Sequence, residues 1–326
     1  MKKNKVLLII LVLLFAVAPL AVFAGGEQEA EEGSDTIVLG VTFMSLRHPF
    51  FQAMQDGMRE YEEEKGIIVR FADADFDIGR QSNQINDFVT QKVDGIIVTP
   101  LDAKGLNPAV NAAVEAGIPV VCVDTDAVGS KRLTKVASDN VLGGRIAAGL
   151  MKGALDDRGV SEGVVLIVDH AGVTSTMERN SGFREVMAEE FPNIQIETMD
   201  AVGQRDKAMN VAEDAIQRFG EQLVGIFGVN DDTSLGALSA VERMEKMDQI
   251  SVVGYDAGDE SKAAIKAGKI VGNTIQFPGK MGQTGIQVLL DYLSGEQTEF
   301  PEFMPVEVGT YTSKGVVDME GNVIGE

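Results

Sequence analysis

Ile118–Asp124 reads IPVVCVD and Ile250–Asp256 reads ISVVGYD, two apolar runs that share the pattern I-x-V-V-x-x-D. Val164–Asp169 (VVLIVD) and Val224–Asn230 (VGIFGVN) likewise end in an acid or an amide. Continuous Val- and Ile-rich runs are typical of strands in a parallel sheet that helices cover on both faces. Because ligands of such sheets bind beyond the carboxyl ends of the strands, the terminal acids and amides predict a binding site. The alternative is that each residue only starts a turn or caps the next helix.

Helical periodicity follows nearly every predicted strand. A strand over Ile37–Phe43 precedes a helix over Pro49–Lys65, which has apolar side chains on one face and proline in its first turn. The alternation continues to a last strand over Ile270–Gln276, just before Pro278. Repeated strand–helix units predict a doubly wound α/β fold. The pattern I-x-V-V-x-x-D, which occurs once in each half of the chain, predicts two lobes of similar topology. Their facing strand ends would make a concave small-molecule site.

The first 24 residues have the features of a secretory signal peptide. Three lysines precede an apolar stretch over Val6–Ala18, and Val22–Ala24 supplies the small residues that a signal peptidase reads. We therefore predict a signal peptide over residues 1–24, cleaved after Ala24, and a periplasmic location. The rival interpretation is an uncleaved membrane anchor, since the apolar segment is just long enough to span a bilayer.

The charge balance is strongly acidic. The chain of 326 residues has 50 Asp and Glu against 28 Lys and Arg, a net charge of −22. This balance argues against nucleic acid and anionic membranes as partners. Residues 25–35 (GGEQEAEEGSD) are acidic and nearly free of apolar side chains, so we expect a disordered tether there. The sole cysteine, Cys122, lies in an apolar run and is expected to be a small buried hydrophobe.

Motifs for catalysis, nucleotide binding and metal binding are absent from the sequence. There is no G-x-x-x-x-G-K-[ST] phosphate loop, no G-x-S-x-G and no H-E-x-x-H. Neither His48 nor His170 has a second ligand at metal spacing. We therefore predict no enzymatic activity, no cofactor and no metal site. His48 precedes Pro49 in an extended or turn position and is expected to hydrogen-bond in a cleft.

The remaining polar and aromatic residues suit a polyhydroxylated ligand. Acids, amides and arginine bind hydroxyl groups through directional hydrogen bonds, and aromatic rings cover apolar C–H faces. The candidate residues of these types are Phe50, Phe51, Asp124, Arg179, Asn230, Asp256 and Gln276. Other interpretations stay open at this point. The two phenylalanines can belong to a core, Arg179 can pair with a surface glutamate (Glu178 or Glu185), and Gln276 can mark only a turn.

Several motifs resemble those of the ribose-binding-type periplasmic substrate-binding proteins, the sugar receptors of ABC importers. The resemblance runs from about Asp35 to the end of the chain. It rests on His48–Phe51 (HPFF), Ala137–Gly144 (ASDNVLGG), Arg179 before Gly182-Phe183, Asn230-Asp231, Val253–Asp256 (VGYD) and Thr274–Gln276 (TIQ). It implies an α/β fold of two Rossmann-like lobes, each a parallel sheet flanked by helices. A three-crossover hinge would join the lobes and close them on a monosaccharide.

The resemblance also implies boundaries and roles. The N-terminal lobe would comprise residues 36–138 and 277–305, and the C-terminal lobe residues 139–276 and 306–326. Crossovers are expected near Ser138–Asp139, Gln276–Phe277 and Pro305–Glu307. Two phenylalanines, Phe50 and Phe51, would stack on the sugar. The residues that would bind its hydroxyl groups are Asp124, Arg179, Asn230, Asp256 and Gln276, and His48 and Thr125 complete the predicted ligand-binding set.

Three positions depart from the ribose binders. His48 stands where they have Asn, Thr125 where they have Arg, and Gly203 where they have Phe. An arginine donor and an aromatic lid are therefore absent, and an imidazole is added. We expect a monosaccharide, ketose or sugar alcohol other than ribose as ligand. We expect a monomer, with an ABC transporter permease and a chemoreceptor as partners.

Three other functions fit parts of the sequence. A receptor for a furanose-like signalling molecule would differ only in its ligand. A ligand-sensing regulator core would need a DNA-binding headpiece where this chain has a predicted signal peptide. A hydrolase could use Asp124 and Asp256 as its carboxylate pair. Those two residues are expected on opposite lobes, so their separation would change as the lobes close, whereas glycosidase carboxylates keep a set separation.

Overall fold

The computed structural model describes residues 36–317 and 323–325. These described residues belong to one compact unit. The predicted signal peptide and acidic tether, residues 1–35, lie outside the described residues. None of the helices in the described part of the chain combines the length and apolar character that crossing a bilayer requires.

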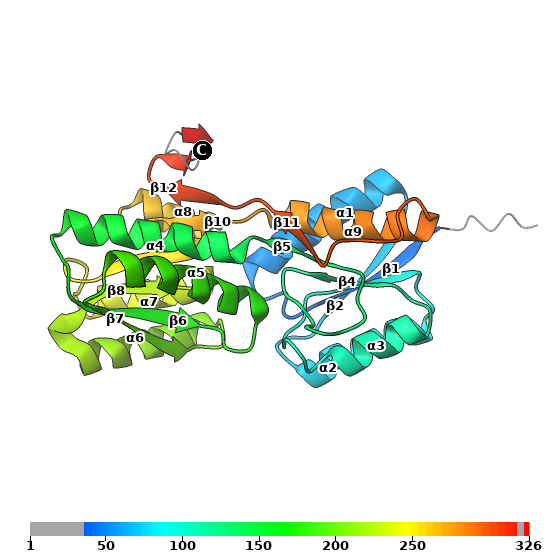
Figure 1. Cartoon of the computed structure of the whole chain (residues 1–326), viewed down its shortest axis with the longest axis horizontal. Helices are drawn as coiled ribbons and strands as arrows, with labels where there is room; N and C mark the ends of the chain where they lie inside the picture. Colours follow the sequence, from blue (N-terminus) through cyan, green and yellow to red (C-terminus); the bar gives the residue numbers. More distant parts are fainter. Residues whose placement is uncertain (1–35, 318–322, 326) are drawn as a thin grey trace, which may run out of the picture. The chain divides into compact units, whose positions relative to one another are not determined.

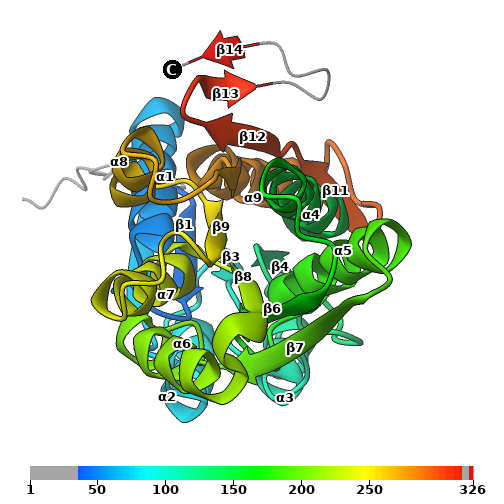
Figure 2. The same ribbon diagram turned by 90° about the vertical axis from the view of Figure 1, so that its left-hand side faces the viewer.

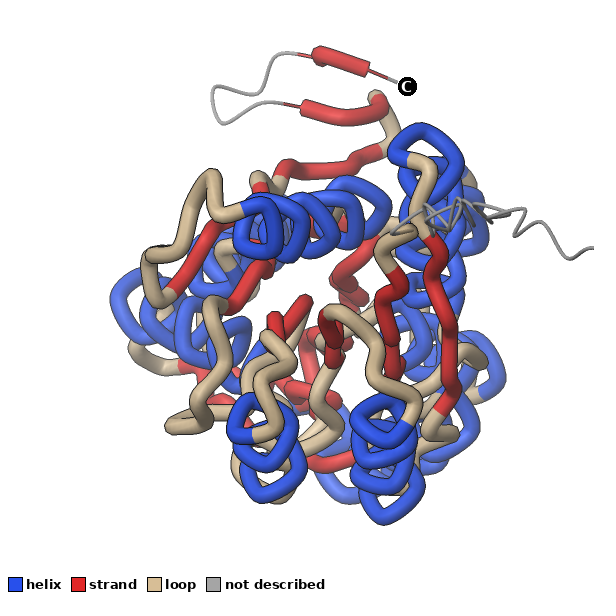
Figure 3. Tube along the Cα trace, turned by 90° about the vertical axis from the view of Figure 1, so that its right-hand side faces the viewer, coloured by secondary structure: helices blue, strands red, loops and turns tan. Residues whose placement is uncertain are grey.

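The first lobe is built on a six-stranded sheet that is parallel throughout, in the order β11-β5-β4-β3-β1-β2. Its strands are β1 (Val38–Phe43), β2 (Ile68–Asp73), β3 (Gly95–Val98), β4 (Val120–Val123), β5 (Lys135–Ser138) and β11 (Phe303–Val306). Its helices are α1 (Pro49–Lys65), α2 (Ile78–Thr90), α3 (Asn107–Glu115) and α9 (Pro278–Ser294). Helix α1 packs against α9 and α2 against α3, and the strands lie between these two pairs (Figure 3).

Alternating side chains of the central strands enter two different cores. Ile97, Val121 and Val123 pack with residues of α1 and α9. Ile96 and Cys122, on the opposite face, pack with residues of α2 and α3. Because both faces are covered, every position of these strands is apolar, which is why the runs read as continuous rather than alternating. Cys122 is buried and free, as predicted, and its burial raises the pKa of the thiol to about 12.

The second lobe is built on an eight-stranded sheet in the order β14-β13-β12-β10-β9-β8-β6-β7. Its parallel strands are β6 (Gly163–Asp169), β7 (Ile194–Asp200), β8 (Leu223–Gly228), β9 (Ser251–Asp256) and β10 (Asn273–Ile275). Antiparallel strands β12 (Gly309–Thr312), β13 (Gly315–Val317) and β14 (Val323–Gly325) extend one edge (Figure 2). The last predicted strand, Ile270–Gln276, is shorter than expected, because only Asn273–Ile275 pairs as regular sheet.

Helices cover both faces of this second sheet. Helices α4 (Asn140–Asp157) and α5 (Thr174–Glu190) pack together on one face, and α6 (Arg205–Phe219) and α7 (Asp231–Arg243) on the other. A short 3₁₀ helix, η1 (Gly220–Gln222), follows α6, and α8 (Asp259–Lys266) packs near β12.

The chain passes between the two sheets three times. It leaves the first sheet after β5 to enter α4, returns after β10 to enter α9, and leaves again after β11 to enter β12. Figure 1 shows the two lobes side by side, with the second lobe on the left. The predicted fold class, two α/β lobes with mostly parallel sheets flanked by helices, is confirmed.

Candidate functional site

A cavity lies at the carboxyl ends of strands from both lobes. The space between its lining atoms, including open solvent at its mouth, is about 420 Å³. Five lining residues end a strand or follow one directly: Met44, Asp124, His170, Asp256 and Gln276. A sixth, Asn230, lies two residues after the end of β8. The N-terminal end of α1 and the first turns of α5 complete the wall with His48, Phe50, Phe51, Val173, Ser175, Thr176 and Arg179, together with Phe76 and Gly203.

All the predicted site residues except Thr125 line this cavity. The hydroxyl of Thr125 donates instead to the carbonyl oxygen of Pro100 at 2.7 Å, and the side chain is buried. The sequence therefore located the cavity, but at this position it did not reveal which way the side chain points.

Sequence reasoning missed several wall residues, including His170 and Phe76. His170 follows Asp169 at the end of β6, one residue beyond the acid of the VVLIVD run. Extending the strand-end argument by one residue would have found it. Phe76 lies in the loop after β2 and gave no such signal.

The N-terminal end of α1 presents an imidazole and two aromatic rings to the cavity. His48 is the N-cap residue, and its Nδ1 accepts a hydrogen bond from the Phe50 amide at 3.2 Å. A neutral His48 ring therefore carries its proton on Nε2. Phe50 and Phe51 meet edge to face, with centroids 5.2 Å apart, and both also belong to the first lobe's core. The core and ligand-wall interpretations of these rings are thus compatible.

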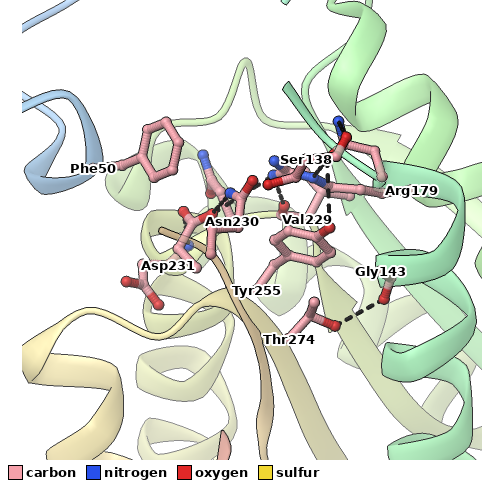
Figure 4. Close-up of polar contacts among 12 residues, drawn as sticks. Phe50, Ser138, Gly143, Arg179, Val229, Asn230, Asp231, Tyr255 and Thr274 are labelled. Atoms are coloured by element: carbon pink, nitrogen blue, oxygen red, sulfur yellow. Dashed lines mark hydrogen bonds and ion pairs between the residues drawn. The ribbon is translucent and has the colours of Figure 1, made fainter. Parts of the chain in front are cut away.

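Arg179 is buried beneath the cavity and does not pair with a surface glutamate. Its Nε donates to Asn140 Oδ1 at 2.9 Å and its Nη1 to the Val229 carbonyl at 2.7 Å. Its guanidinium lies 3.8 Å from the centroid of the Tyr255 ring (Figure 4). These three contacts fix the plane of the guanidinium. The two glutamates that were candidate partners bind elsewhere, Glu178 to Lys135 and Glu185 to Arg145.

The ASDNVLGG stretch holds Arg179 in place. It forms the start of α4, where Asp139 caps the helix and Asn140 accepts from Arg179. Gly144 permits the close approach of α5, because a Cβ there would lie 2.1 Å from the Arg179 carbonyl oxygen. Thr274 fastens the same helix to β10 by donating to the Gly143 carbonyl at 2.8 Å (Figure 4).

The carboxylate of Asp256 is surrounded by partners. Its Oδ1 accepts from Gln276 Nε2 at 2.6 Å, and its Oδ2 accepts from the Asp231 amide at 3.2 Å. Arg179 Nη1 lies 3.7 Å from Oδ1, and His48 Nε2, from the opposite lobe, lies 3.9 Å from Oδ2. Asp256 also has a φ of 82°, in the left-handed region that non-glycine residues rarely adopt.

The carboxyl group of Asp124 is less well satisfied. Its Oδ1 is buried without a hydrogen-bond partner. Burial raises the pKa of Asp124 to about 7, although Arg179 nearby opposes the shift. Its φ of 68° places it in the same unusual backbone region as Asp256. Strained residues of this kind cluster at ligand sites, where the surrounding structure holds them.

Asn230 both caps a helix and lines the cavity. Its side chain accepts from the Thr233 amide at 2.8 Å in a capping box that starts α7. Its Nδ2 donates to the Gly203 carbonyl at 3.3 Å. One side chain therefore caps a helix and lines the cavity at the same time.

Three polar atoms on lining residues are buried without a partner: His48 Nε2, Asp124 Oδ1 and Gln276 Oε1. Buried polar groups in native proteins are almost always hydrogen-bonded, so these three atoms are available to bond to a ligand or to water in the cavity. A donor and two acceptors beside aromatic rings match the chemistry of hydroxyl groups on a carbon frame. Within the described ranges, no group of three or more His, Cys, Asp or Glu side chains is suited to hold a metal ion.

Contacts between the lobes enclose the cavity. The Asp126 amide donates to Thr174 Oγ1 at 2.8 Å, and Lys135 Nζ lies 2.8 Å from Glu178 Oε1. In each pair the first residue belongs to the first lobe and the second to the start of α5. The described structure is therefore a form in which the two lobes touch over the site.

Comparison with known proteins places this geometry in a family. The profile described as periplasmic binding protein domain matches residues 39–297. The chain belongs to this family. It is 29% identical over 272 residues to the ribose import binding protein RbsB of Bacillus subtilis, covering 83% of this chain and 87% of the relative. It is 28% identical over 301 residues to the xylitol-binding protein of Mycolicibacterium smegmatis, covering 92% and 84%.

A solved structure extends the comparison. The ABC transporter periplasmic solute-binding protein of Actinobacillus succinogenes, with bound D-allose, superposes with a TM-score of 0.76 at 27% identity. The match covers 86% of this chain and 98% of that one. The resemblance inferred from the sequence motifs is thereby confirmed. These relatives are binding proteins and not enzymes, which supports a non-enzymatic function and argues against the hydrolase alternative.

Proposed function

We propose that this protein is an exported solute-binding protein that captures a monosaccharide or related polyol between its lobes and delivers it to an ABC importer. The observation that carries the proposal is the set of unpaired polar atoms on His48, Asp124 and Gln276, buried beside Phe50 and Phe51. The relatives named for ribose, xylitol and D-allose share one ligand class, small molecules with many hydroxyl groups.

The proposed ligand is a sugar or polyol other than ribose. The Thr125 hydroxyl is bonded to Pro100, so this position offers the ligand no donor. Gly203 supplies no ring to the wall, and His48 adds an imidazole nitrogen. These three departures from the ribose binders change both the donors and the shape that a ligand meets.

Ligand capture is proposed to proceed by hinge closure. The lobes would comprise residues 36–138 with 277–305, and residues 139–276 with 306–326, and would rotate about the three crossovers. Asp124 and the two phenylalanines belong to the first lobe, whereas Arg179 and Asp256 belong to the second. A ligand that bonds to both sets has more contacts in the closed form and therefore shifts the population towards it.

The proposed location and partners follow from this role. A signal peptide cleaved after Ala24 would export the protein to the periplasm. There the monomeric, ligand-loaded form would dock on an ABC permease, with a chemoreceptor as a second partner. The acidic surface suits such a soluble carrier rather than a nucleic-acid binder.

A thermal-shift panel of pentoses, hexoses, ketoses and sugar alcohols tests the proposal, followed by calorimetry on the strongest stabiliser. We expect one polyol other than ribose to give the largest shift. If ribose alone stabilises the protein, the ligand assignment is wrong. If no sugar or polyol stabilises it, the function itself is wrong. Product formed from the stabilising sugar would restore the hydrolase alternative.

A further inference from the structure

His170 provides a second imidazole in the cavity wall, on the lobe opposite His48. It follows the last residue of β6, its side chain is buried, and it lines the cavity. Among the residues that the structure describes, none forms a hydrogen bond with either nitrogen of its ring; only its backbone carbonyl is bonded, to Thr176 Oγ1 at 2.7 Å. The ring thus faces the cavity with its hydrogen-bonding capacity unused.

The absence of a side chain at Gly203 leaves room for the His170 ring. A Cβ at position 203 would lie 2.7 Å from His170 Nδ1 and 3.1 Å from its Cγ, closer than packed atoms approach. Gly203 also has a φ of 66°, in the region that favours glycine. On another side Phe76, from the first lobe, meets the His170 ring edge-on with centroids 6.2 Å apart. The ring therefore packs between Gly203, which has no side chain, and Phe76 of the first lobe.

The His170 ring is neutral at physiological pH. Burial lowers the pKa of His170 to about 4, with Asp200 opposing the shift and Arg179 and Lys207 adding to it. A neutral imidazole offers one N–H donor and one nitrogen acceptor. A hydroxyl group, which both donates and accepts, can pair with either nitrogen.

We propose that His170 is a specificity-determining residue that hydrogen-bonds one hydroxyl group of the ligand, and that Gly203 serves to leave room for its ring. The inference rests on the proposed function, because it assigns one contact within that site. A site that hydrogen-bonds a hydroxyl group discriminates strongly against an analogue that lacks it, since the site's polar atom is then left unpaired. Ligand affinity should therefore depend strongly on the hydroxyl group that faces His170.

The test compares wild type with His170→Phe, which keeps an aromatic ring beside Phe76 but has no ring nitrogen. Dissociation constants are measured by calorimetry for D-ribose, xylitol, D-allose and myo-inositol. For the tightest binder, the series of analogues that each lack one hydroxyl group is then measured. In wild type we expect one analogue to bind at least about tenfold more weakly than its parent because of the missing contact with His170.

In His170→Phe, affinity for the parent should fall about tenfold while affinity for that one analogue stays the same. The variant thereby loses discrimination at one hydroxyl group and keeps it at the others. A purely structural role for His170 would instead weaken the parent and all analogues by one common factor. That result, or unchanged affinities throughout, overturns the inference.

Gly203→Ala tests the same inference through the neighbouring backbone. Its Cβ should displace the imidazole and reproduce the loss of discrimination, with little further effect when combined with His170→Phe. Gly129→Ala is the matched control, because Gly129 has a φ of 80° and a Cβ there would meet no packed atom within 4 Å. It should alter stability but not the pattern of affinities. Should His170→Phe fail to fold, as judged by ligand-free thermal unfolding, the two alanine variants decide the question.

The outcomes separate this inference from the proposed function. Wild type that binds no sugar or polyol, either among these four or in the thermal-shift panel, overturns the proposed function and the role of His170 with it. Wild type that binds one of them, together with a uniform loss in His170→Phe, overturns the role of His170 alone.

Discussion

Asp124 at the end of β4 and Asp256 at the end of β9 occupy matching places in the two lobes. Both end the pattern I-x-V-V-x-x-D, both are buried in the cavity wall, and both have a positive φ. Their surroundings differ. Asp256 is bonded to Gln276 and to the Asp231 amide, whereas Asp124 keeps an oxygen with no partner.

Under the proposed function, this difference gives the two lobes different parts in ligand binding. In the second lobe the carboxylate is already fixed by its neighbours, with Arg179 beside it, so this half of the site is organised before the ligand arrives. In the first lobe the carboxyl group is buried without compensation, so the ligand is needed to satisfy it. Such an arrangement favours closure only when a ligand is present, because an empty closed cleft leaves Asp124 unpaired.

The largest effect is expected from Asp256→Ala. The change removes the acceptor for Gln276 and the Asp231 amide and leaves Arg179 without its nearest carboxylate in the cavity. A buried hydrogen bond to a charged group is worth about 1.5–3 kcal/mol. Calorimetry should therefore show ligand affinity falling more than about tenfold, and the ligand-free protein should unfold at a lower temperature. Unchanged affinity would remove Asp256 from the site.

Asp124→Asn should have a smaller effect on affinity, about tenfold, because Asn keeps one acceptor oxygen. Its distinctive signature is the pH dependence of stability. The folded-state pKa of Asp124 is raised to about 7, so between about pH 4 and 7 the folded protein binds a proton that the unfolded chain has lost. The contribution of this group to stability therefore falls as the pH rises through that window.

The measurement for Asp124→Asn is the unfolding temperature of the ligand-free protein at pH 5 and pH 8, with wild type run in parallel. Because the amide does not titrate, the variant should gain stability relative to wild type as the pH rises. A difference between variant and wild type that is the same at both pH values contradicts the contrast drawn between the two aspartates.

Lys135→Met tests how much the contacts between the lobes outside the cavity stabilise the closed form. The Lys135–Glu178 pair joins the lobes, with the lysine side chain buried and the glutamate partly exposed. Removing it should favour the open form by about 1 kcal/mol, the upper end for exposed pairs, and speed ligand release about fivefold in stopped-flow measurements. The matched control is Lys152→Met, whose ion pair with Asp156 lies within α4. Equal release rates for both variants would show that the interlobe pair contributes nothing to closure.

The smallest effect on binding is expected from Thr125→Val. Thr125 follows Asp124 as Ala257 follows Asp256, but its hydroxyl is bonded to Pro100 and not turned to the cavity. Affinity should stay within about twofold of wild type, while stability falls by about 1 kcal/mol through loss of the hydrogen bond. A tenfold loss of affinity with unchanged stability would return Thr125 to the predicted ligand-binding set.

The elements that the sequence predicted best are those whose two faces are buried. β4 and β6 read as uninterrupted apolar runs because helices cover both sides, and the residues just beyond their ends could be located from that alone. The antiparallel strands β12 and β13 were not foreseen. They are three or four residues long and lie partly exposed at a sheet edge, so they carry no such signal.

The site residues divide in the same way. Asp256 and Asn230 were found because strand ends of a parallel sheet converge on one edge. Phe76 was missed because its place in the wall depends on the first lobe lying against the second, where it meets His170, a residue far away in the sequence. The sequence did not reveal that Thr125 lies outside the cavity lining, because the direction of a side chain after a strained residue is set by its neighbours, here the Pro100 carbonyl.

By itself, the sequence determined the α/β alternation, the strand ends that carry acids and amides, and the class of ligand that such side chains suit. These features could be predicted from short segments, because apolar periodicity and the residue types at strand ends are local properties of the sequence. Only the tertiary structure decided which carboxylate is already bonded and which is left unpaired, since hydrogen-bond partners come from distant segments. It also placed His170 over Gly203, a contact that depends on the exact path of two loops.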